Sequence, residues 1–178
     1  MTNFIRTTSL AATVAFLAAT ASPALAVTGP TEVTPDKQAT ATARIVKPLT
    51  LKWARDLDLG TIVLSGPAGF TGATVSIDQA GTLDCSNANL TCSGPVKSAM
   101  YTITGTDNQV VTVNSSSVDM VNAATGTHLT LTPDVPATVN LGSLGATGKP
   151  LRIGGSLSLD SATADGVYVG NFAVTVNY

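Results

Sequence analysis

The stretch that decides the fold is Gly166-Val-Tyr-Val-Gly-Asn-Phe-Ala-Val-Thr-Val-Asn-Tyr178. Successive side chains of a β-strand point to opposite faces, so apolar residues at every second position indicate a half-buried strand. The row on one face has a single gap at Gly170 and otherwise consists of Tyr168, Phe172, Val174, Val176 and Tyr178. We therefore predict one strand over 166–178. It is either the ordinary closing strand of a complete β-sandwich or a strand whose edge serves assembly or recognition.

Short segments of the same alternating character recur along the rest of the chain, and clusters of Gly, Asn, Asp and Pro separate them. The other predicted strands are 39–46, 49–53, 56–64, 73–77, 99–104, 109–113, 128–132 and 151–159. Beyond the first 26 residues, no segment keeps a helical period of apolar residues over three turns. The prediction is an all-β, immunoglobulin-like antiparallel β-sandwich of about eight or nine short strands.

The first 26 residues have the pattern of an export signal. Arg6 precedes an apolar run over 10–19, and Pro23-Ala-Leu-Ala26 resembles a signal-peptidase site. The run is shorter than the roughly 20 residues that a membrane span needs, so we expect no transmembrane span in the mature chain. Residues 27–38 contain Pro30 and Pro35 and little apolar surface, which predicts a mobile N-terminal arm. Residues 39–178 are expected to form a single domain.

The composition excludes several classes of function. Charged residues make up 11% and aromatic residues 4% of the chain, and the formal net charge is −2. Nucleic-acid binding needs a concentrated basic patch, which the sequence lacks. A single histidine, His128, lies within a Thr/Leu strand pattern, which leaves little material for a nucleophile and its base. We therefore expect no enzymatic activity, no catalytic residues and no cofactor.

The two cysteines of the chain, Cys85 and Cys92, lie close together in the sequence. Export places them in an oxidising compartment, so we predict that they form a disulfide with each other. A loop this short contributes about 2.5 kcal/mol by the chain-entropy estimate, which makes the bond a local brace. A metal site would need more ligands than this pair and the distant His128 supply.

Three further residues leave two interpretations open. Asp56 and Asp58 share one strand face, where paired carboxylates suit acid–base chemistry or Ca²⁺. A solvated strand entry is the favoured interpretation, because a calcium site needs several more oxygen ligands. Trp53, the single tryptophan of the chain, is either a core residue or an exposed aromatic for stacking against a glycan.

Two motifs at the ends of the predicted domain resemble those of a family of small secreted proteobacterial domains of unknown function. The first is Ala39-Thr-Ala-Thr-Ala-Arg-Ile-Val-Lys-Pro-Leu-Thr-Leu51 followed by Asp56-Leu-Asp-Leu-Gly-Thr-Ile62, and the second is the closing stretch 166–178. More distantly, the closing stretch resembles that of chaperone–usher pilins, including the spore-coat-U-like archaic branch. In those pilins a Gly precedes alternating apolar residues and a Tyr at or next to the C-terminus.

The resemblance to pilins implies a β-sandwich that lacks one strand. In such fibres a periplasmic chaperone pairs with the terminal strand, and the N-terminal extension of a neighbour later replaces it by β-strand addition. Carried onto this chain, the residues of the chaperone-paired assembly strand are Gly166, Tyr168, Phe172, Val174, Val176 and Tyr178. The donor strand lies within 27–46, and its inward residues are Ala39, Ala41, Ala43 and Ile45.

These features together lead us to expect a non-enzymatic structural subunit of a fimbria-like surface fibre, built by β-strand donation. Its implied partners are a periplasmic chaperone, an outer-membrane usher and neighbouring subunits. The implied location is the periplasm in transit and then the surface or exterior of a Gram-negative bacterium. The alternative is a self-complete secreted module that binds a glycan or a cell-envelope polymer. The sequence leaves open whether the arm donates to a neighbour or completes its own sandwich.

Overall fold

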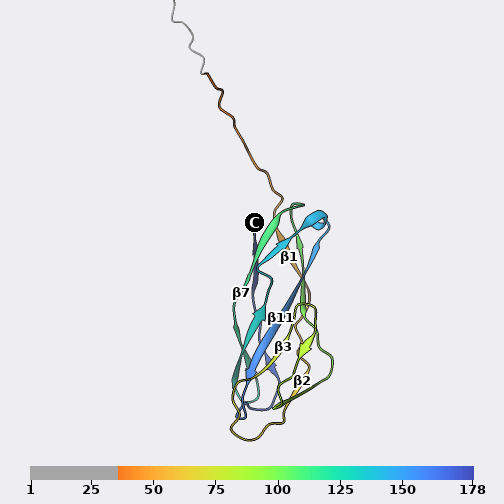
Figure 1. The fold of residues 1–178 in the computed structure, drawn as a ribbon, viewed down its shortest axis with the longest axis vertical. Coiled ribbons are helices and arrows are strands. Elements are labelled where there is room, and N and C mark those ends of the chain that lie inside the picture. Colours follow the sequence, from red (N-terminus) through yellow and green to blue (C-terminus); the bar gives the residue numbers. More distant parts are fainter. Residues whose placement is uncertain (1–35) are drawn as a thin grey trace, which may run out of the picture. The chain divides into compact units, whose positions relative to one another are not determined.

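A computed structural model describes residues 36–178, and its regular elements are β-strands and one short 3-10 turn, η1 Gly142–Leu144 (Figure 1). In chain order the strands are β1 Thr50–Arg55, β2 Thr61–Leu64, β3 Ala73–Ile77, β4 Leu83–Asp84, β5 Leu90–Ser93, β6 Ala99–Thr104, β7 Val110–Ser115, β8 Val118–Asn122, β9 His128–Asp134, β10 Thr138–Asn140, β11 Lys149–Leu159, β12 Tyr168–Val169 and β13 Val174–Asn177. All strand pairs are antiparallel. The predicted all-β class is confirmed. No helix in this described part of the chain is long and apolar enough to cross a membrane.

The long strand β11 organises the largest sheet. Its first half pairs with β6, and its second half pairs with both β3 and β9. The main path of that sheet runs β1-β6-β11-β9-β8-β12. In addition, β3 pairs with β11, and β4 pairs with β3. Two smaller sheets complete the fold, one with the order β10-β7-β13 and one formed by β2 and β5. The last two strands of the chain therefore belong to different sheets.

Two glycines allow β11 to change partners. A Cβ atom on Gly154 would lie 2.2 Å from the carbonyl oxygen of Ile77, and one on Gly155 would lie 3.0 Å from Leu57 and 3.1 Å from Leu131. Real Cβ atoms do not approach a backbone oxygen that closely, so position 154 admits only glycine without a local shift. The Gly-Gly pair inside an otherwise apolar strand thus marks a close approach of two backbones.

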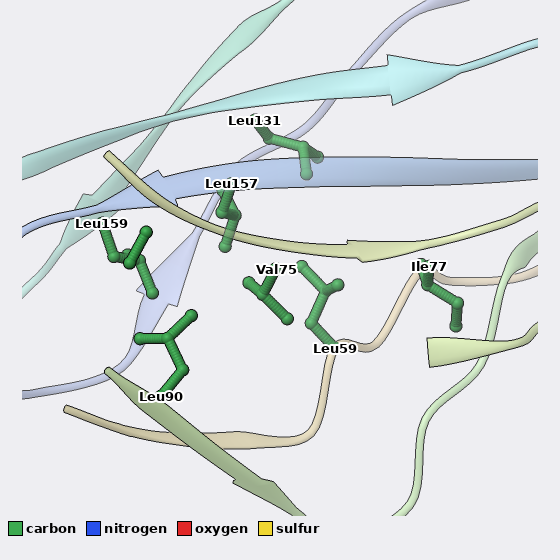
Figure 2. Close-up of a cluster of buried hydrophobic side chains, with 8 residues drawn as sticks. Leu59, Val75, Ile77, Leu90, Leu131, Leu157 and Leu159 are labelled. Carbon is green, nitrogen blue, oxygen red and sulfur yellow. The ribbon is translucent and has the colours of Figure 1, made fainter. Parts of the chain in front are cut away.

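The apolar face of β11 contributes to both hydrophobic clusters of the core. Leu151 and Ile153 belong to the first half of the strand and lie in one cluster with buried residues of β6 and β7. Leu157 and Leu159 lie in the other, which Figure 2 shows as side chains gathered from several strands and from the segment before β2. The members of this second group, here called the leucine cluster, are Leu59, Ala73, Val75, Ile77, Leu90, Leu131, Leu157 and Leu159. The single strand β11 therefore contributes buried side chains to both clusters.

The prediction of one continuous terminal strand is wrong. The alternation of side chains along 166–178 is present, but β12 pairs with β8 whereas β13 pairs with β7. The chain leaves the large sheet after β12. Gly170 still lies close to Met120 of β8, and Phe172 then packs against both core clusters. A period of two reports the facing of side chains but does not report a change of pairing partner.

The predicted strand over 39–46 is also absent. These residues are exposed and carry no strand assignment, and Ile45 is 92% exposed. Alternating Ala and Thr offer little apolar surface to hold such a segment against a sheet. The sequence analysis did not predict β4, β5, β8 and β10, which have between two and five residues each.

Candidate functional site: an open apolar groove

A groove of about 1100 Å³ opens into the leucine cluster. Two chain segments border it, residues 56–64, which end in β2, and residues 163–172, which contain β12. Strands β8, β9 and β11 contribute further apolar lining through Met120, Leu129, Leu131, Leu157 and Leu159. Four members of the leucine cluster, Leu59, Leu131, Leu157 and Leu159, therefore belong to the lining of the groove, although each is at most 9% exposed.

Both bordering strands are at sheet edges. Among the described residues β2 pairs with β5 alone, and β12 is the last strand of the largest sheet. An edge strand presents a row of backbone donors and acceptors that a further strand can use. An apolar groove flanked by such edges has the two properties that β-strand addition requires, main-chain hydrogen bonding and pockets for alternate side chains.

The border that contains β12 is fixed by polar contacts at Asn122, which is 1% exposed. Its side-chain amide donates to the carbonyl oxygen of Asp165 at 2.9 Å and accepts from the backbone of Ala124 at 3.0 Å. Gly166 has a φ of 137°, and a Cβ atom there would lie 2.3 Å from the Asn122 side chain. The predicted assembly residue Gly166 is therefore required locally for close packing.

Hydrogen bonds also hold Tyr168, a second residue of the same border. The Tyr168 hydroxyl donates to the carbonyl oxygen of Ala164 at 2.8 Å and lies 2.9 Å from the Thr127 hydroxyl. These contacts hold the 163–172 segment at the border of the groove, and among residues 36–178 no strand pairs with both β12 and β2.

Trp53 lines the groove and is 57% exposed. Its indole N–H donates to Asp56 at 2.9 Å, and it stands opposite Tyr101 in the pairing of β1 with β6. Burial, and secondarily the negative charge of Asp56, raises the pKa of Tyr101. Of the two interpretations of Trp53, the structure supports the exposed aromatic.

Carboxylates of Asp56, Asp58 and Asp165 lie at the groove and are exposed. Asp58 accepts a hydrogen bond from the backbone of Gly60 at 2.9 Å, which is the behaviour of a loop-capping residue. Within residues 36–178 no group of three or more His, Cys, Asp or Glu side chains is arranged to hold a metal ion. His128 is an exposed residue at the start of β9.

The predicted disulfide between Cys85 and Cys92 is confirmed, with Cα atoms 6.2 Å apart. Cys92 lies in β5 opposite Ile62 of β2, and both cysteines pack against the leucine cluster. The bond therefore braces the strand that carries one border of the groove.

The remaining predicted site residues fall into two places. Val174 and Val176 of β13 pack against the cluster formed with β6 and β7, away from the leucine cluster. Tyr178 instead reaches the backbone of Lys47, where the described arm joins the sandwich, and its hydroxyl donates to the Lys47 carbonyl at 2.6 Å. The proposed donor residues Ala39, Ala41, Ala43 and Ile45 are exposed. The six predicted assembly residues thus do not form one continuous strand, although Tyr168 and Phe172 both line the groove.

Sequence reasoning missed the apolar lining of the groove. The usable signal was the concentration of leucines at alternating positions, Leu57 and Leu59 in one segment and Leu157 and Leu159 in another. Nothing in those patterns indicates that the two segments meet beside an opening.

A scan against protein-family models matches residues 49–178 to a domain of unknown function, DUF4402. The comparisons with curated proteins and with solved structures give no match. The family match covers more than half of the chain and includes both borders of the groove.

Proposed function

The chain belongs to DUF4402, a family of domains of unknown function, and we propose that it is a non-enzymatic structural subunit of a surface fibre assembled by β-strand donation. The observation that carries the proposal is the open groove between β2 and the 163–172 segment. A strand laid there would cover exposed apolar lining such as Val63, which is 50% exposed, and would meet unpaired strand edges. In this proposal the groove is the acceptor.

The proposed occupant is the arm of a second copy of the chain. From here on, the arm is the whole of residues 27–46. Its donor part presents Ala39, Ala41, Ala43 and Ile45 on one face and Thr40, Thr42 and Arg44 on the other. With the Ala/Ile face inward, Arg44 would point outward among carboxylates such as Asp56 and Asp165. Opposite charges at the rim favour encounter and register more than they add affinity.

The length of the chain favours a neighbour over self-insertion. A strand advances about 3.3 Å per residue, so an arm that reversed at Lys47 and ran back along β1 would bring Ala41 level with Trp53. The polar, proline-containing residues that precede Ala39 would then face the part of the groove lined by Leu59 and Leu157. An arm from another copy has no such restriction, so its apolar face can lie along the whole groove.

Export, a chaperone and an usher form part of the same proposal. An apolar groove with exposed strand edges aggregates unless it is covered, so a subunit needs a protecting partner before assembly. A strand supplied by a periplasmic chaperone would cover the groove in transit. The disulfide and the export signal are compatible with this route to the cell surface.

The experiment that tests the proposal compares the oxidised chain from Val27 with one that lacks residues 27–46. Light scattering and electron microscopy measure the size of each protein alone and of their mixture. We expect filaments or stable oligomers from the longer chain and monomers from the deleted one. Well-folded monomers from both, at every concentration, would exclude strand donation.

A second candidate function is a binding module for a glycan or cell-envelope polymer, and the exposed Trp53 favours it. The Trp53 indole lines the groove, and its Nε1 lies 2.9 Å from Oδ1 of Asp56. The pair offers a sugar a stacking surface and a hydrogen-bond acceptor. Because Trp53 is the single tryptophan, its emission can be titrated with a panel of sugars. Saturable quenching that Asp56→Ala weakens would favour this function over the fibre.

A further inference from the structure

The C-terminal tyrosine closes a ring of hydrogen bonds around the base of the arm. The Tyr178 hydroxyl donates to the carbonyl oxygen of Lys47 at 2.6 Å and accepts from the backbone N–H of Thr106 at 2.9 Å. The N–H of Lys47 donates to the hydroxyl of Thr106 at 2.6 Å. We call this ring of Lys47, Thr106 and Tyr178 the root clip.

The surroundings of the root clip leave little room for other arrangements. A Cβ atom on the buried Gly105 would lie 2.7 Å from the Tyr178 hydroxyl and 2.8 Å from Leu49. Pro48 follows Lys47 and restricts the backbone at the same place. Both backbone polar groups of Lys47 are therefore engaged, although neighbouring residues 43–46 are exposed.

We infer that Tyr178 is a positioning residue, because its hydroxyl fixes the backbone at Lys47, the point from which the donor segment continues to a second copy. This inference rests on the proposed function. With Lys47 held at both its N–H and its carbonyl group, the chain cannot easily reverse there and run back along β1. Fixing the direction of a donor segment before binding reduces the ordering that association requires.

The last segment of the chain, β13 and Tyr178, then has two roles. β13 pairs with β7 and so belongs to the sandwich, whereas its final side chain holds the segment that donates. Loss of the hydroxyl should therefore impair donation and leave the acceptor groove intact. A purely structural role of Tyr178 would impair both.

The test separates donation from acceptance with two measurements on Tyr178→Phe. Donation is the rate at which the full chain from Val27 assembles, followed by light scattering. Acceptance is measured on a chain whose own arm is disabled by Ala41→Asp and Ala43→Asp, both at exposed positions. A synthetic peptide of residues 36–48 is titrated into that chain, with and without Tyr178→Phe, and the Trp53 emission reports binding. Thr106→Val removes the other hydroxyl of the root clip, and Thr106→Ser is the matched control that keeps it.

We expect Tyr178→Phe and Thr106→Val to slow assembly by about fivefold, which corresponds to about 1 kcal/mol. Thr106→Ser should assemble at the wild-type rate, and the peptide affinity should be equal with and without the Tyr178 hydroxyl. Amide exchange at Lys47 should accelerate in the two disruptive variants.

Two results would overturn the positioning role while leaving strand donation in place, namely an unchanged assembly rate or a peptide affinity that falls together with that rate. If the wild-type chain does not assemble and the arm-disabled chain binds no peptide, the proposed function fails and the positioning role fails with it.

Discussion

Ile45→Ala tests whether the arm is a donor, because the structure leaves this side chain free of its own domain. Ile45 is 92% exposed, so the substitution should change the free energy of unfolding of the monomer by less than about 0.5 kcal/mol. In an assembled fibre the same side chain would be buried in a neighbour's groove. Removing three carbon atoms at about 0.8 kcal/mol each then weakens association by about 2.4 kcal/mol, or about 60-fold.

The assay measures the concentration at which half of the protein is assembled, by light scattering, and the thermal midpoint of dilute monomer. Val46→Ala is the matched control, because Val46 faces the opposite side of the arm and is 39% exposed. We expect it to lower the thermal midpoint slightly and to leave assembly unchanged. The reasoning is refuted if Ile45→Ala leaves the half-assembly concentration unchanged or if both substitutions shift it equally.

Three further predictions concern the sandwich itself. Gly154→Ala should destabilise the fold by about 2–3 kcal/mol, because its Cβ would meet the Ile77 carbonyl oxygen. Denaturant unfolding measures this loss, and Ser158→Ala at an exposed position of the same strand is the control. Equal unfolding midpoints for the two variants would contradict the prediction. Replacing Cys85 and Cys92 together by Ala should lower stability by about 2.5 kcal/mol and loosen the β2 border of the groove, and faster amide exchange in β2 and β5 would report that loosening. The pKa of Asp78 is lowered chiefly by the Thr82 backbone N–H, and that of Asp84 chiefly by the Ser86 hydroxyl, both from an ordinary value of 3.8. Since the folded state binds these protons more weakly than the unfolded state, the stabilisation is present above pH 3.8 and declines as the pH falls below it. Asp78→Asn with Asp84→Asn should flatten that part of the unfolding curve, and an unchanged acid slope would count against the assignment.

The sequence predicted the features that depend on neighbouring residues. The strand character of 73–77, 99–104 and 151–159 follows from local alternation, and the disulfide follows from two close cysteines in a chain with a predicted export signal.

The features that the sequence did not predict depend on which segments meet in space. Side-chain period is the same whether β12 and β13 share one partner or pair with β8 and β7 in different sheets. The same limit applies to the groove, because no local pattern indicates that Leu59 and Leu157 line the same opening. The contact of Tyr178 with Lys47 joins the two ends of the domain and has no local signature.

The most direct measurement is the fluorescence emission of Trp53 in the oxidised chain from Val27, recorded over a wide range of protein concentration. Trp53 is the single tryptophan, lines the groove and is 57% exposed. Its emission therefore changes when a strand shields the indole from water at the groove. Strand donation predicts a shift to shorter wavelength as concentration rises, loss of the shift in the Ala41→Asp, Ala43→Asp chain, and its return when the 36–48 peptide is added. An emission maximum that is the same at all concentrations and unaffected by the peptide would contradict the account.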